Sequence, residues 1–277
     1  MDQQHEVSEA MAKVKTSSVP GKVSPKQTTQ FDEKALINVA AEARNRVELW
    51  SRIFTDNQCK TVAEVGVWKG AFAEETLRRC PAIENYVMID PWRHLPDWNK
   101  PANGAHVAFE DIYAEAVRRT RFAEEKLTIL RERTVVAGRS LSDGYLDAAY
   151  IDGDHTLRGI TIDLVTMLPK IRTGGLIGGD DFTKTIWQHT GNYDPTLVFP
   201  YAVYFAEAND LPIYSLPFEQ FLIVNDPGLG FKFEDLAGGY LNLAMRELAA
   251  MPRKTLVQTL KSAVPAPLKR LLKRRRG

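Results

Sequence analysis

Apolar residues divide the chain into a polar beginning, a long alternating centre and a basic end. Residues 1–30 hold few large apolar side chains. This stretch buries too little surface to offset the entropy lost on ordering, so we expect a flexible arm. From residue 31 to about residue 53, apolar residues recur at steps of three and four. That spacing is typical of a helix lying on the body of a protein.

Strand-like and helix-like stretches alternate through the centre of the chain. Apolar and β-branched runs predict five strands, at residues 61–67, 85–90, 127–134, 146–152 and 174–181. Helical spacing lies between them, at residues 71–79, 106–123 and 160–171. Strands that alternate with helices imply crossover connections and a parallel sheet covered on both faces. The sequence therefore predicts a doubly wound, three-layer α/β fold.

The pattern changes after the fifth predicted strand. Residues 182–200 are aromatic and polar without a clear period, which is typical of a long loop over a binding site. A helix is expected at 201–210, followed by closely spaced strands at 212–216 and 219–226. Their short connection predicts an antiparallel hairpin on one edge of the sheet. Helical spacing returns at 240–262.

These boundaries divide the chain into five parts. We expect a disordered arm, an N-terminal helix, the main α/β domain, a C-terminal helical segment and a basic tail, at residues 1–30, 31–56, 57–230, 231–262 and 263–277. No apolar run is long enough for a membrane-spanning helix, and the first residues lack the apolar core of a secretory signal. Cys59 and Cys80 are too few for a disulfide framework or a four-ligand zinc site. A reduced, cytoplasmic chain is expected.

The net charge of +1 conceals an asymmetry. Nine of the 36 Lys and Arg residues follow Glu247 and no acid does, so the preceding chain carries −8 from 27 basic and 35 acidic residues. An acidic body is not typical of a protein whose main face binds nucleic acid specifically. The tail places leucines among basic residues. This pattern fits peripheral contact with an anionic membrane at the inner face, a solvated tail or a weak nucleic-acid contact.

The first two predicted strands end in residues suited to a nucleoside. Glu64, Gly66 and Gly70 form E-x-G-x-x-x-G, which differs from the G-x-G-x-x-G turn of dinucleotide-binding proteins. Glycines let a backbone approach a ligand closely, although such glycines are as often structural. Asp90, at the end of the second strand, could accept hydrogen bonds from both ribose hydroxyls or serve as a turn or cap residue.

Acidic residues follow the fourth and fifth predicted strands. Asp152 ends one strand, and Asp180 and Asp181 end the next. Neighbouring strands lie about 4.8 Å apart, so these carboxylates can meet and repel one another unless a cation joins them. Mg²⁺ is the natural candidate, and the alternative is that one Asp caps a helix while another is solvated. His155 could take a proton at neutral pH or be structural.

Several of these segments together resemble a known protein family. The segments EVGVWKGAFAEETL, YVMIDPW and AAYIDGDHTLRG, with the later GGDDF, are similar to class I S-adenosylmethionine-dependent methyltransferases. More narrowly, they resemble the bacterial IDGDH-type group that includes metal-dependent sugar O-methyltransferases acting on macrolides. The similarity spans roughly residues 35–226. It implies a Rossmann-like, mostly parallel seven-stranded sheet with an antiparallel last strand.

The resemblance also implies roles for individual residues. It assigns the methionine part of the cofactor to Glu64, Gly66 and Gly70, its ribose to Asp90, its adenine to the neighbourhood of Arg139 and Ser140, and the metal to Asp152, Asp180 and Asp181. Asp152 thereby also adjoins the cofactor and the reacting groups. His155 stands where catechol methyltransferases have a lysine base, and Asp181 stands where they have an asparagine.

The expected function is Mg²⁺-assisted O-methylation of a hydroxyl on a sugar or polyol-like acceptor. Three alternatives remain open: a metal-independent O- or N-methyltransferase with His155 alone, a non-catalytic scaffold that retains the fold, and, more distantly, an NAD-dependent oxidoreductase. The acceptor could be a polysaccharide unit, a glycolipid, a macrolide sugar or a catechol-like phenol. Aromatic residues that could stack on a sugar or pack in loops are Trp187, His189, Tyr193 and Tyr201, and those that could cover the cofactor are Trp92, His94 and Trp98. The helix at 31–53 is a plausible element of a homo-oligomer interface.

Overall fold

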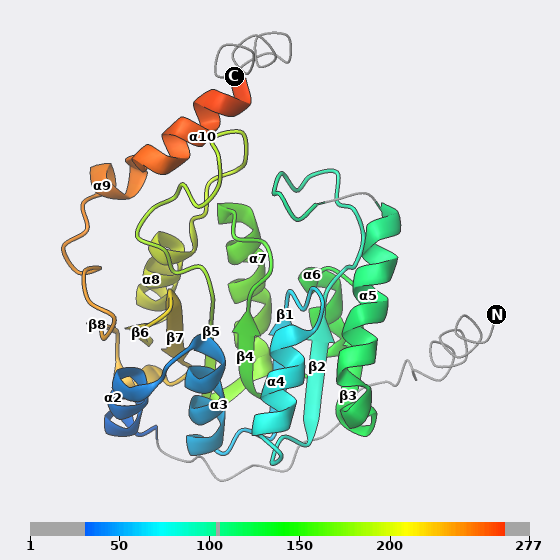
Figure 1. The fold of residues 1–277 in the computed structure, drawn as a ribbon. Coiled ribbons are helices and arrows are strands. Elements are labelled where there is room, and N and C mark those ends of the chain that lie inside the picture. The colour runs from blue at the N-terminus through cyan, green and yellow to red at the C-terminus, as the bar shows by residue number, and fades with distance from the viewer. Residues whose placement is uncertain (1–30, 104–105, 264–277) are drawn as a thin grey trace.

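The computed structural model describes residues 31–103 and 106–263, and these build one sheet with helices on both faces (Figure 1). The predicted arm at 1–30 and nearly all of the predicted tail, from residue 264, lie outside the described residues. The strands are β1 (Thr61–Val65), β2 (Asn85–Ile89), β3 (Leu127–Leu130), β4 (Leu146–Ile151), β5 (Ile171–Gly179), β6 (Pro212–Leu216), β7 (Gln220–Val224) and β8 (Lys232–Asp235). Their spatial order is β3-β2-β1-β4-β5-β7-β6-β8.

The doubly wound fold predicted from the sequence is confirmed. Strands β3, β2, β1, β4 and β5 run parallel, and β7 runs antiparallel to both of its neighbours, β5 and β6. The expected number of seven strands is wrong, because β8 pairs in parallel with β6. The β6–β7 hairpin consequently does not form the edge of the sheet, and β8 does.

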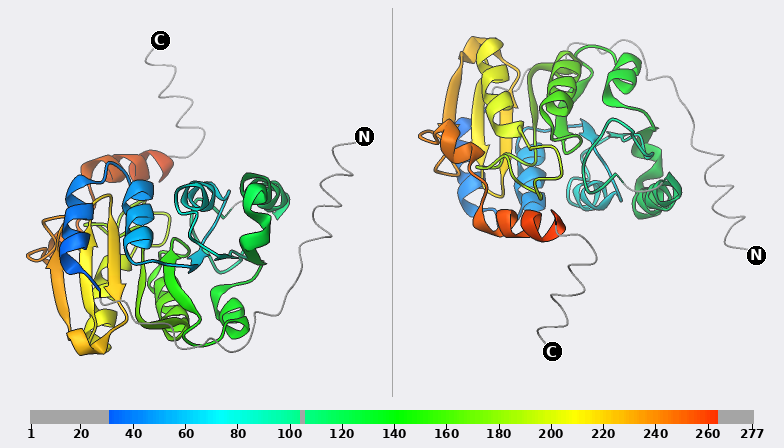
Figure 2. Two further views of the ribbon diagram at one scale, coloured as in Figure 1. Left: turned by 90° about the horizontal axis from the view of Figure 1, so that it is seen from below. Right: turned by 90° about the horizontal axis from the view of Figure 1, so that it is seen from above.

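Each face of the sheet has its own layer of helices, as the two end-on views in Figure 2 show. The first core combines alternate strand residues with α2 (Glu33–Glu42), α3 (Arg46–Asp56), α4 (Ala71–Arg79) and α5 (His106–Thr120). The second core combines the other strand residues with α6 (Thr134–Ala137), α7 (Leu157–Met167) and α8 (Val198–Ala208). Successive strand residues point to opposite faces. Tyr150 of β4 therefore belongs to the first core, and Ile151 belongs to the second.

Two predicted helices are each divided in the structure. The helix expected at 31–53 is α2 and α3, because Ala43 and Asn45 have extended backbones and the Asn45 side chain caps α3 by accepting a hydrogen bond from the Glu48 N–H. The helix expected at 240–262 is α9 (Met245–Ala249) and α10 (Arg253–Ala263). Pro252 stands between them and disfavours a helical conformation for the residue before it.

The remaining connections include four short 3₁₀ turns, at η1 (Arg121–Lys126), η2 (Gly138–Ser140), η3 (Leu168–Lys170) and η4 (Pro227–Leu229). The long loop predicted at 182–200 is confirmed over residues 182–197, which contain neither helix nor strand, and α8 begins at Val198. Within the described residues, no helix combines the length and apolar character needed to cross a bilayer.

Candidate functional site

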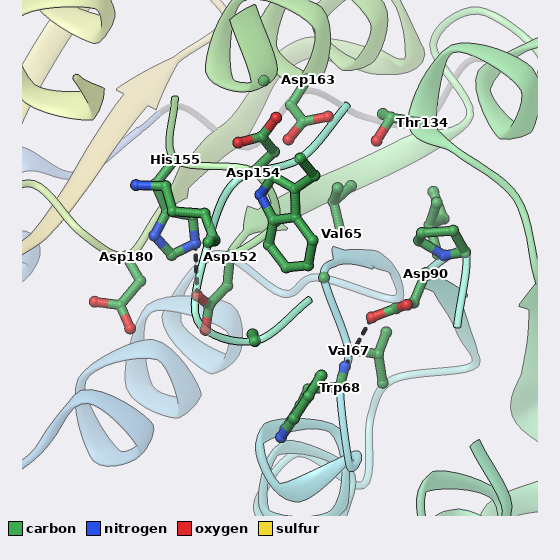
Figure 3. Close-up of a pocket in the computed structure, with 18 of the residues that line it drawn as sticks. Val65, Val67, Trp68, Asp90, Thr134, Asp152, Asp154, His155, Asp163 and Asp180 are labelled. Carbon is green, nitrogen blue, oxygen red and sulfur yellow. Dashed lines mark hydrogen bonds and ion pairs between the residues drawn. The ribbon is translucent and has the colours of Figure 1, made fainter. Parts of the chain in front are cut away.

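A cavity of about 560 Å³ opens where the parallel strands of the central sheet end (Figure 3). The turns after β1, β2, β4 and β5 all line it, and this end of an open parallel sheet is where ligands of such folds bind. Asp90 lies on the β2 side, and Asp152 and Asp180 lie on the β4 and β5 side. Strands β2 and β5 are three strand spacings apart, which corresponds to about 14 Å. One cavity therefore joins the two groups of predicted site residues.

The turn after β1 needs both of its glycines, for different reasons. Gly66 has φ +86°, and a Cβ there would lie 2.1 Å from the backbone oxygen of Asp152. The ends of β1 and β4 approach each other so closely that no side chain fits between them. Gly70 has φ +73°, and a Cβ there would lie 3.0 Å from the Cα of Ala116 in α5. Gly66 lines the cavity, whereas Gly70 packs α4 against α5.

Glu64 lies on β1 beneath this turn and is buried. One of its carboxylate oxygens accepts a 2.7 Å hydrogen bond from the hydroxyl of Tyr86. Burial raises the pKa of Glu64 well above its usual range, with the Tyr86 hydrogen bond opposing the shift. Glu64 lines the cavity, as the sequence predicted, and is a buried carboxyl group that reaches the cavity from below.

Asp90 both lines the cavity and holds two backbone turns together. Its carboxylate accepts hydrogen bonds from the N–H groups of Trp68, at 2.9 Å, and Trp92, at 2.7 Å. Burial raises the pKa of Asp90 to about 6, against these hydrogen bonds. The turn role and the ligand-facing position, which the sequence left as alternatives, therefore coexist. Trp92 is buried in the core beneath the site, whereas Trp98 lines the cavity.

The segment after β3 enters the cavity at a different place from the one predicted. Arg139 and Ser140 are exposed in the η2 turn and do not line the cavity. The residues that do are Glu132, Arg133 and Thr134. The difference arises because β3 ends at Leu130 and the chain enters the cavity at once, before α6 carries it away from the site.

The carboxylates after β4 and β5 meet, as the sequence predicted, and an arginine lies between two of them. Nη1 of Arg46 contacts Oδ2 of Asp180 and lies 3.3 Å from Oδ2 of Asp152. Burial raises the pKa of Asp152 to about 6, although the charge of Arg46 opposes this. Arg46 is the first residue of α3, more than a hundred residues away in the sequence, and no local motif indicated it.

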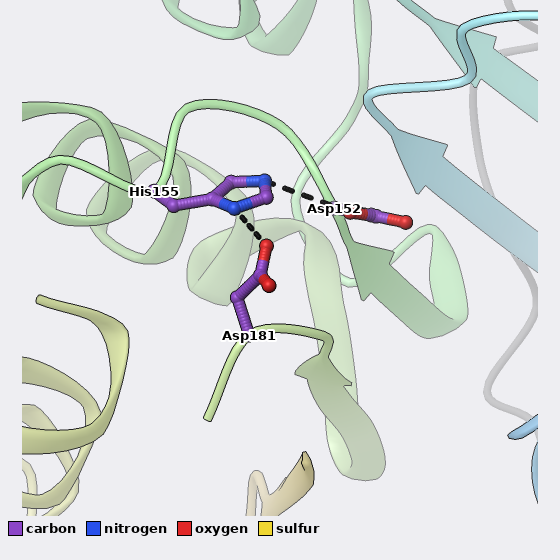
Figure 4. A group of neighbouring side chains, drawn as sticks. All are labelled: Asp152, His155 and Asp181. Atoms are coloured by element: carbon purple, nitrogen blue, oxygen red, sulfur yellow. Dashed lines mark ion pairs between the residues drawn. The ribbon is translucent and has the colours of Figure 1, made fainter. Parts of the chain in front are cut away.

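Asp181 reaches the same site because the chain turns there. Its φ of +59° carries its side chain to the side where Nδ1 of His155 contacts Oδ2 of Asp181 (Figure 4). Nε2 of His155 lies 3.6 Å from Oδ1 of Asp152. Burial, with the nearby charge of Lys100, lowers the pKa of His155 to about 3, so the ring is neutral at pH 7.

A buried glutamine supports Asp180 from beneath. Gln220 of β7 donates a 2.6 Å hydrogen bond from Nε2 to Oδ1 of Asp180. Its Oε1 accepts hydrogen bonds from Nε1 of Trp50, at 2.9 Å, and from the hydroxyl of Tyr150, at 3.2 Å. All three supporting side chains are fully buried. Asp180 thus rests on a rigid polar network that sequence patterns did not reveal.

A further buried carboxyl group lines the cavity near the segment after β3. Asp163 of α7 is 4% exposed, and its carboxyl group interacts with the hydroxyl of Thr134 and with the backbone of Asp154. Burial raises the pKa of Asp163 to about 7. Asp154 itself accepts a 3.0 Å hydrogen bond from the N–H of Thr156, and Thr156 caps α7 by accepting a hydrogen bond from the N–H of Gly159.

The long loop contributes less to the cavity than its aromatic residues suggested. His189 lines the cavity, whereas Trp187 donates a hydrogen bond to the backbone oxygen of Ala249 and Tyr201 packs against the second core. Lys100, which sequence reasoning missed, lines the cavity and ties two loops together. Its Nζ donates hydrogen bonds to the oxygen of Asp194 and to Thr196.

The donor set suits a divalent cation. Asp152, His155 and Asp181 each offer a ligand atom, and these atoms all lie within 4.8 Å of one another. Carboxylate oxygens are the ligands that Mg²⁺ prefers, and imidazole is accepted by several transition metals. The residues present therefore fit a metal ion, provided that the contacts they make with Arg46 and with one another are exchanged for it.

Comparison with known proteins adds a family to this geometry. Residues 63–182 match the sequence profile of a family described as "Methyltransferase domain". The match begins in β1, ends just after Asp181 and so includes the predicted cofactor and metal residues. No curated protein shows significant similarity to the chain.

Several solved structures resemble this chain at low sequence identity, and the first of them shares its fold. A Staphylococcus aureus protein described as a candidate caffeoyl-CoA O-methyltransferase is 13% identical, with a TM-score of 0.50 over 70% of this chain and 89% of its own. A candidate O-methyltransferase from Klebsiella pneumoniae is 16% identical, with a TM-score of 0.48 over 70% and 90%. An SAH-bound methyltransferase from Podospora anserina is 14% identical, with a TM-score of 0.45 over 81% and 95%. The chain thus combines a Rossmann-like methyltransferase fold with a methyltransferase-domain sequence at residues 63–182.

Proposed function

We propose that this protein is an S-adenosylmethionine-dependent O-methyltransferase whose acceptor is a hydroxyl on a sugar or polyol-like molecule, and that Mg²⁺ assists the reaction. The observation that carries the proposal is the single cavity that has Asp90 on one side and the Asp152, His155 and Asp181 group on the other. A methyl donor and an acceptor hydroxyl must occupy adjoining parts of one site, because transfer requires in-line alignment at about 3 Å.

The cofactor would lie across the ends of β1 and β2. Gly66 lines the cavity where the backbones of β1 and β4 meet, and Asp90 retains oxygen lone pairs for ribose hydroxyls after accepting two N–H groups. We now assign the adenine side to Glu132, Arg133 and Thr134, since Arg139 and Ser140 do not line the cavity. When bound, S-adenosylmethionine supplies an activated methyl group on a sulfonium and leaves as S-adenosylhomocysteine.

Asp152 and Asp181 would hold the metal together with Asp180, the third ligand that the resemblance implies, so that His155 is left to act as the base. A bound Mg²⁺ would lower the pKa of an acceptor hydroxyl and orient it, and a vicinal oxygen could complete a chelate. With a hydrogen on Nδ1 donated to Asp181, the Nε2 lone pair of His155 would take the acceptor proton. The carboxylate of Asp181 would stabilise the positive charge that the ring gains.

A specific observation favours one second candidate, a methyltransferase without a metal. Arg46 already supplies a positive charge to Asp152 and Asp180, so the acidic group is partly compensated by the chain itself. In that candidate His155 would act alone on an oxygen or nitrogen nucleophile. Metal dependence of turnover distinguishes the two.

The test begins with the acceptor. Untargeted metabolite and glycan profiling of a deletion strain should reveal an acceptor lighter by one methyl group, which the purified protein then methylates with S-adenosylmethionine. EDTA, or replacement of both Asp152 and Asp180 by Ala, should abolish that turnover. Unchanged turnover under both conditions would reject the metal-assisted reaction and favour the second candidate.

A further inference from the structure

We infer that Arg46 is a built-in competitor of the divalent cation: its guanidinium occupies the carboxylate oxygens that a metal ion needs and must leave them when the ion binds. This inference deepens the metal part of the proposed function and rests on it. Arg46 lies outside the segment that matches the methyltransferase family, since α3 precedes residue 63.

The hydrogen bonds of Asp180 leave one oxygen for a cation. Oδ1 accepts hydrogen bonds from Nε2 of Gln220, at 2.6 Å, and from the N–H of Asp181, at 2.8 Å. Oδ2 is the other oxygen, and Arg46 contacts it. A metal ion that uses Asp180 would bind Oδ2, the oxygen that Arg46 now contacts. The two cations cannot both occupy this position.

Asp152 has the same arrangement. Its Oδ1 faces the ring of His155 at 3.6 Å, and its Oδ2 faces Arg46 at 3.3 Å. One guanidinium nitrogen therefore bridges Asp152 and Asp180, two of the three carboxylates that the resemblance assigned to the metal. A guanidinium is held there by charge and hydrogen bonds, as a metal ion would be, but it carries a single positive charge.

Arg46 is able to leave this position. Its side chain is 41% exposed, in contrast to the buried groups beneath it, and it extends from the first residue of α3, at the edge of the site. Rotation of the side chain would return the guanidinium to water without moving the helix. The supporting network of Gln220, Trp50 and Tyr150 does not involve Arg46, so Asp180 stays in place when Arg46 leaves.

Removing the charge of Arg46 should therefore tighten metal binding. A unit charge at about 4 Å repels a metal ion appreciably even at the effective dielectric of a protein surface, so at least about a tenfold gain in affinity is expected. The conservative variant R46K keeps the charge and should bind metal much like the original protein. The matched control is R52Q, because Arg52 lies on the same helix and pairs with Glu42, away from the site.

The experiment is calorimetric titration of MnCl₂ and MgCl₂ into the full chain without cofactor or acceptor. The inference predicts that R46Q binds at least about tenfold more tightly than the unmodified chain, that R46K and R52Q bind as the unmodified chain does, and that metal raises the Tm of R46Q the most. Equal or weaker metal binding by folded R46Q, or no metal binding by any of the proteins, would overturn it. Titration of S-adenosylhomocysteine into the same preparations separates the two proposals. If S-adenosylhomocysteine binds and metal binds R46Q no more tightly than the unmodified chain, only this inference fails. If no variant binds metal, the metal part of the proposed function fails as well. If S-adenosylhomocysteine binds to none of the proteins, the proposed function itself fails.

Discussion

Gln220 begins β7 and Asp180 directly follows the neighbouring antiparallel strand β5, and the 2.6 Å hydrogen bond from Nε2 of Gln220 to Oδ1 of Asp180 fixes the direction in which that carboxylate faces the cavity. The same amide holds Trp50 and Tyr150 through its oxygen. The cavity end of β5 is therefore connected to the core beneath α3. Breaking this connection should lower the free energy of unfolding by a measurable amount.

Replacing Gln220 by Ala should destabilise the fold. The change leaves the indole N–H of Trp50 and the hydroxyl of Tyr150 buried without this shared acceptor, and an unsatisfied buried group costs about 1–3 kcal/mol. We expect a loss of about 2–4 kcal/mol in the free energy of unfolding, measured with urea. Gln258, exposed on α10, gives the control: Q258A should change stability by less than about 0.5 kcal/mol. Equal effects of the two substitutions would contradict the network.

Asp163 should make stability depend on pH. Its pKa is raised from 3.8 to about 7 by burial, so the folded state favours the protonated carboxyl. Its stabilising contribution is complete below pH 3.8 and is lost as pH rises through 7. D163N removes this dependence and should gain stability relative to the unmodified chain between pH 5 and pH 8, by an amount on the order of 2–4 kcal/mol.

The control for Asp163 is Asp97, whose pKa is lowered to about 2 by hydrogen bonds from Arg133 and then Arg158. For a lowered carboxyl pKa, the stabilising contribution is present above 3.8 and is lost only as pH falls through 2. D97N should therefore leave the slope of stability between pH 5 and pH 8 unchanged. Parallel pH profiles for D163N and the unmodified chain would show that Asp163 is not strongly perturbed.

Substitutions at Gly66 and Gly230 distinguish the cost of a strained backbone from the cost of a steric clash with a neighbouring strand. Both have positive φ, +86° and +70°, but a Cβ on Gly66 would meet the backbone of Asp152 and one on Gly230 would meet nothing within 4 Å. G230A should cost only the strain, about 1–2 kcal/mol. G66A should cost more than about 4 kcal/mol or prevent folding, because β1 and β4 must separate. Similar melting temperatures for the two variants would disprove the close approach.

The adenine side of the cavity can be mapped by two arginines. Arg133 lines the cavity and Arg139 does not. We expect R133A to weaken binding of S-adenosylhomocysteine by about tenfold, which corresponds to about 1.4 kcal/mol, and R139A to leave it unchanged. Calorimetric titration measures both. A loss confined to R139A would restore the assignment made from the sequence.

Hydrophobic periodicity predicted most of the fold, because the spacing of apolar residues in each buried strand and each amphipathic helix reflects which of its sides are buried. The alternation across residues 61–181 was sufficient for the parallel sheet. Strand β8 escaped because its four residues, KFED, are short and half-exposed at the edge of the sheet. The break between α2 and α3 contains no Gly or Pro, and Asn45, whose side chain caps α3, was its one local signal.

The site was predictable where it depends on strand ends and not where it depends on packing. Asp90, Asp152 and Asp180 follow strands, and parallel strands end at one edge of a sheet. Arg46 and Gln220 come from elements distant in the chain, and only the tertiary fold brings them to the carboxylates. The assignment of the adenine side to Arg139 and Ser140 came from the resemblance alone, and these residues lie in the η2 turn, outside the cavity lining.

The most direct test of the central claim is calorimetric titration of the full chain with S-adenosylhomocysteine and, separately, with NAD. A methyl-donor pocket predicts saturable binding of one S-adenosylhomocysteine per chain, a substantial loss of that binding in D90A, and no binding of NAD. Binding of NAD in place of S-adenosylhomocysteine, or the absence of any binding by the folded protein, would contradict it.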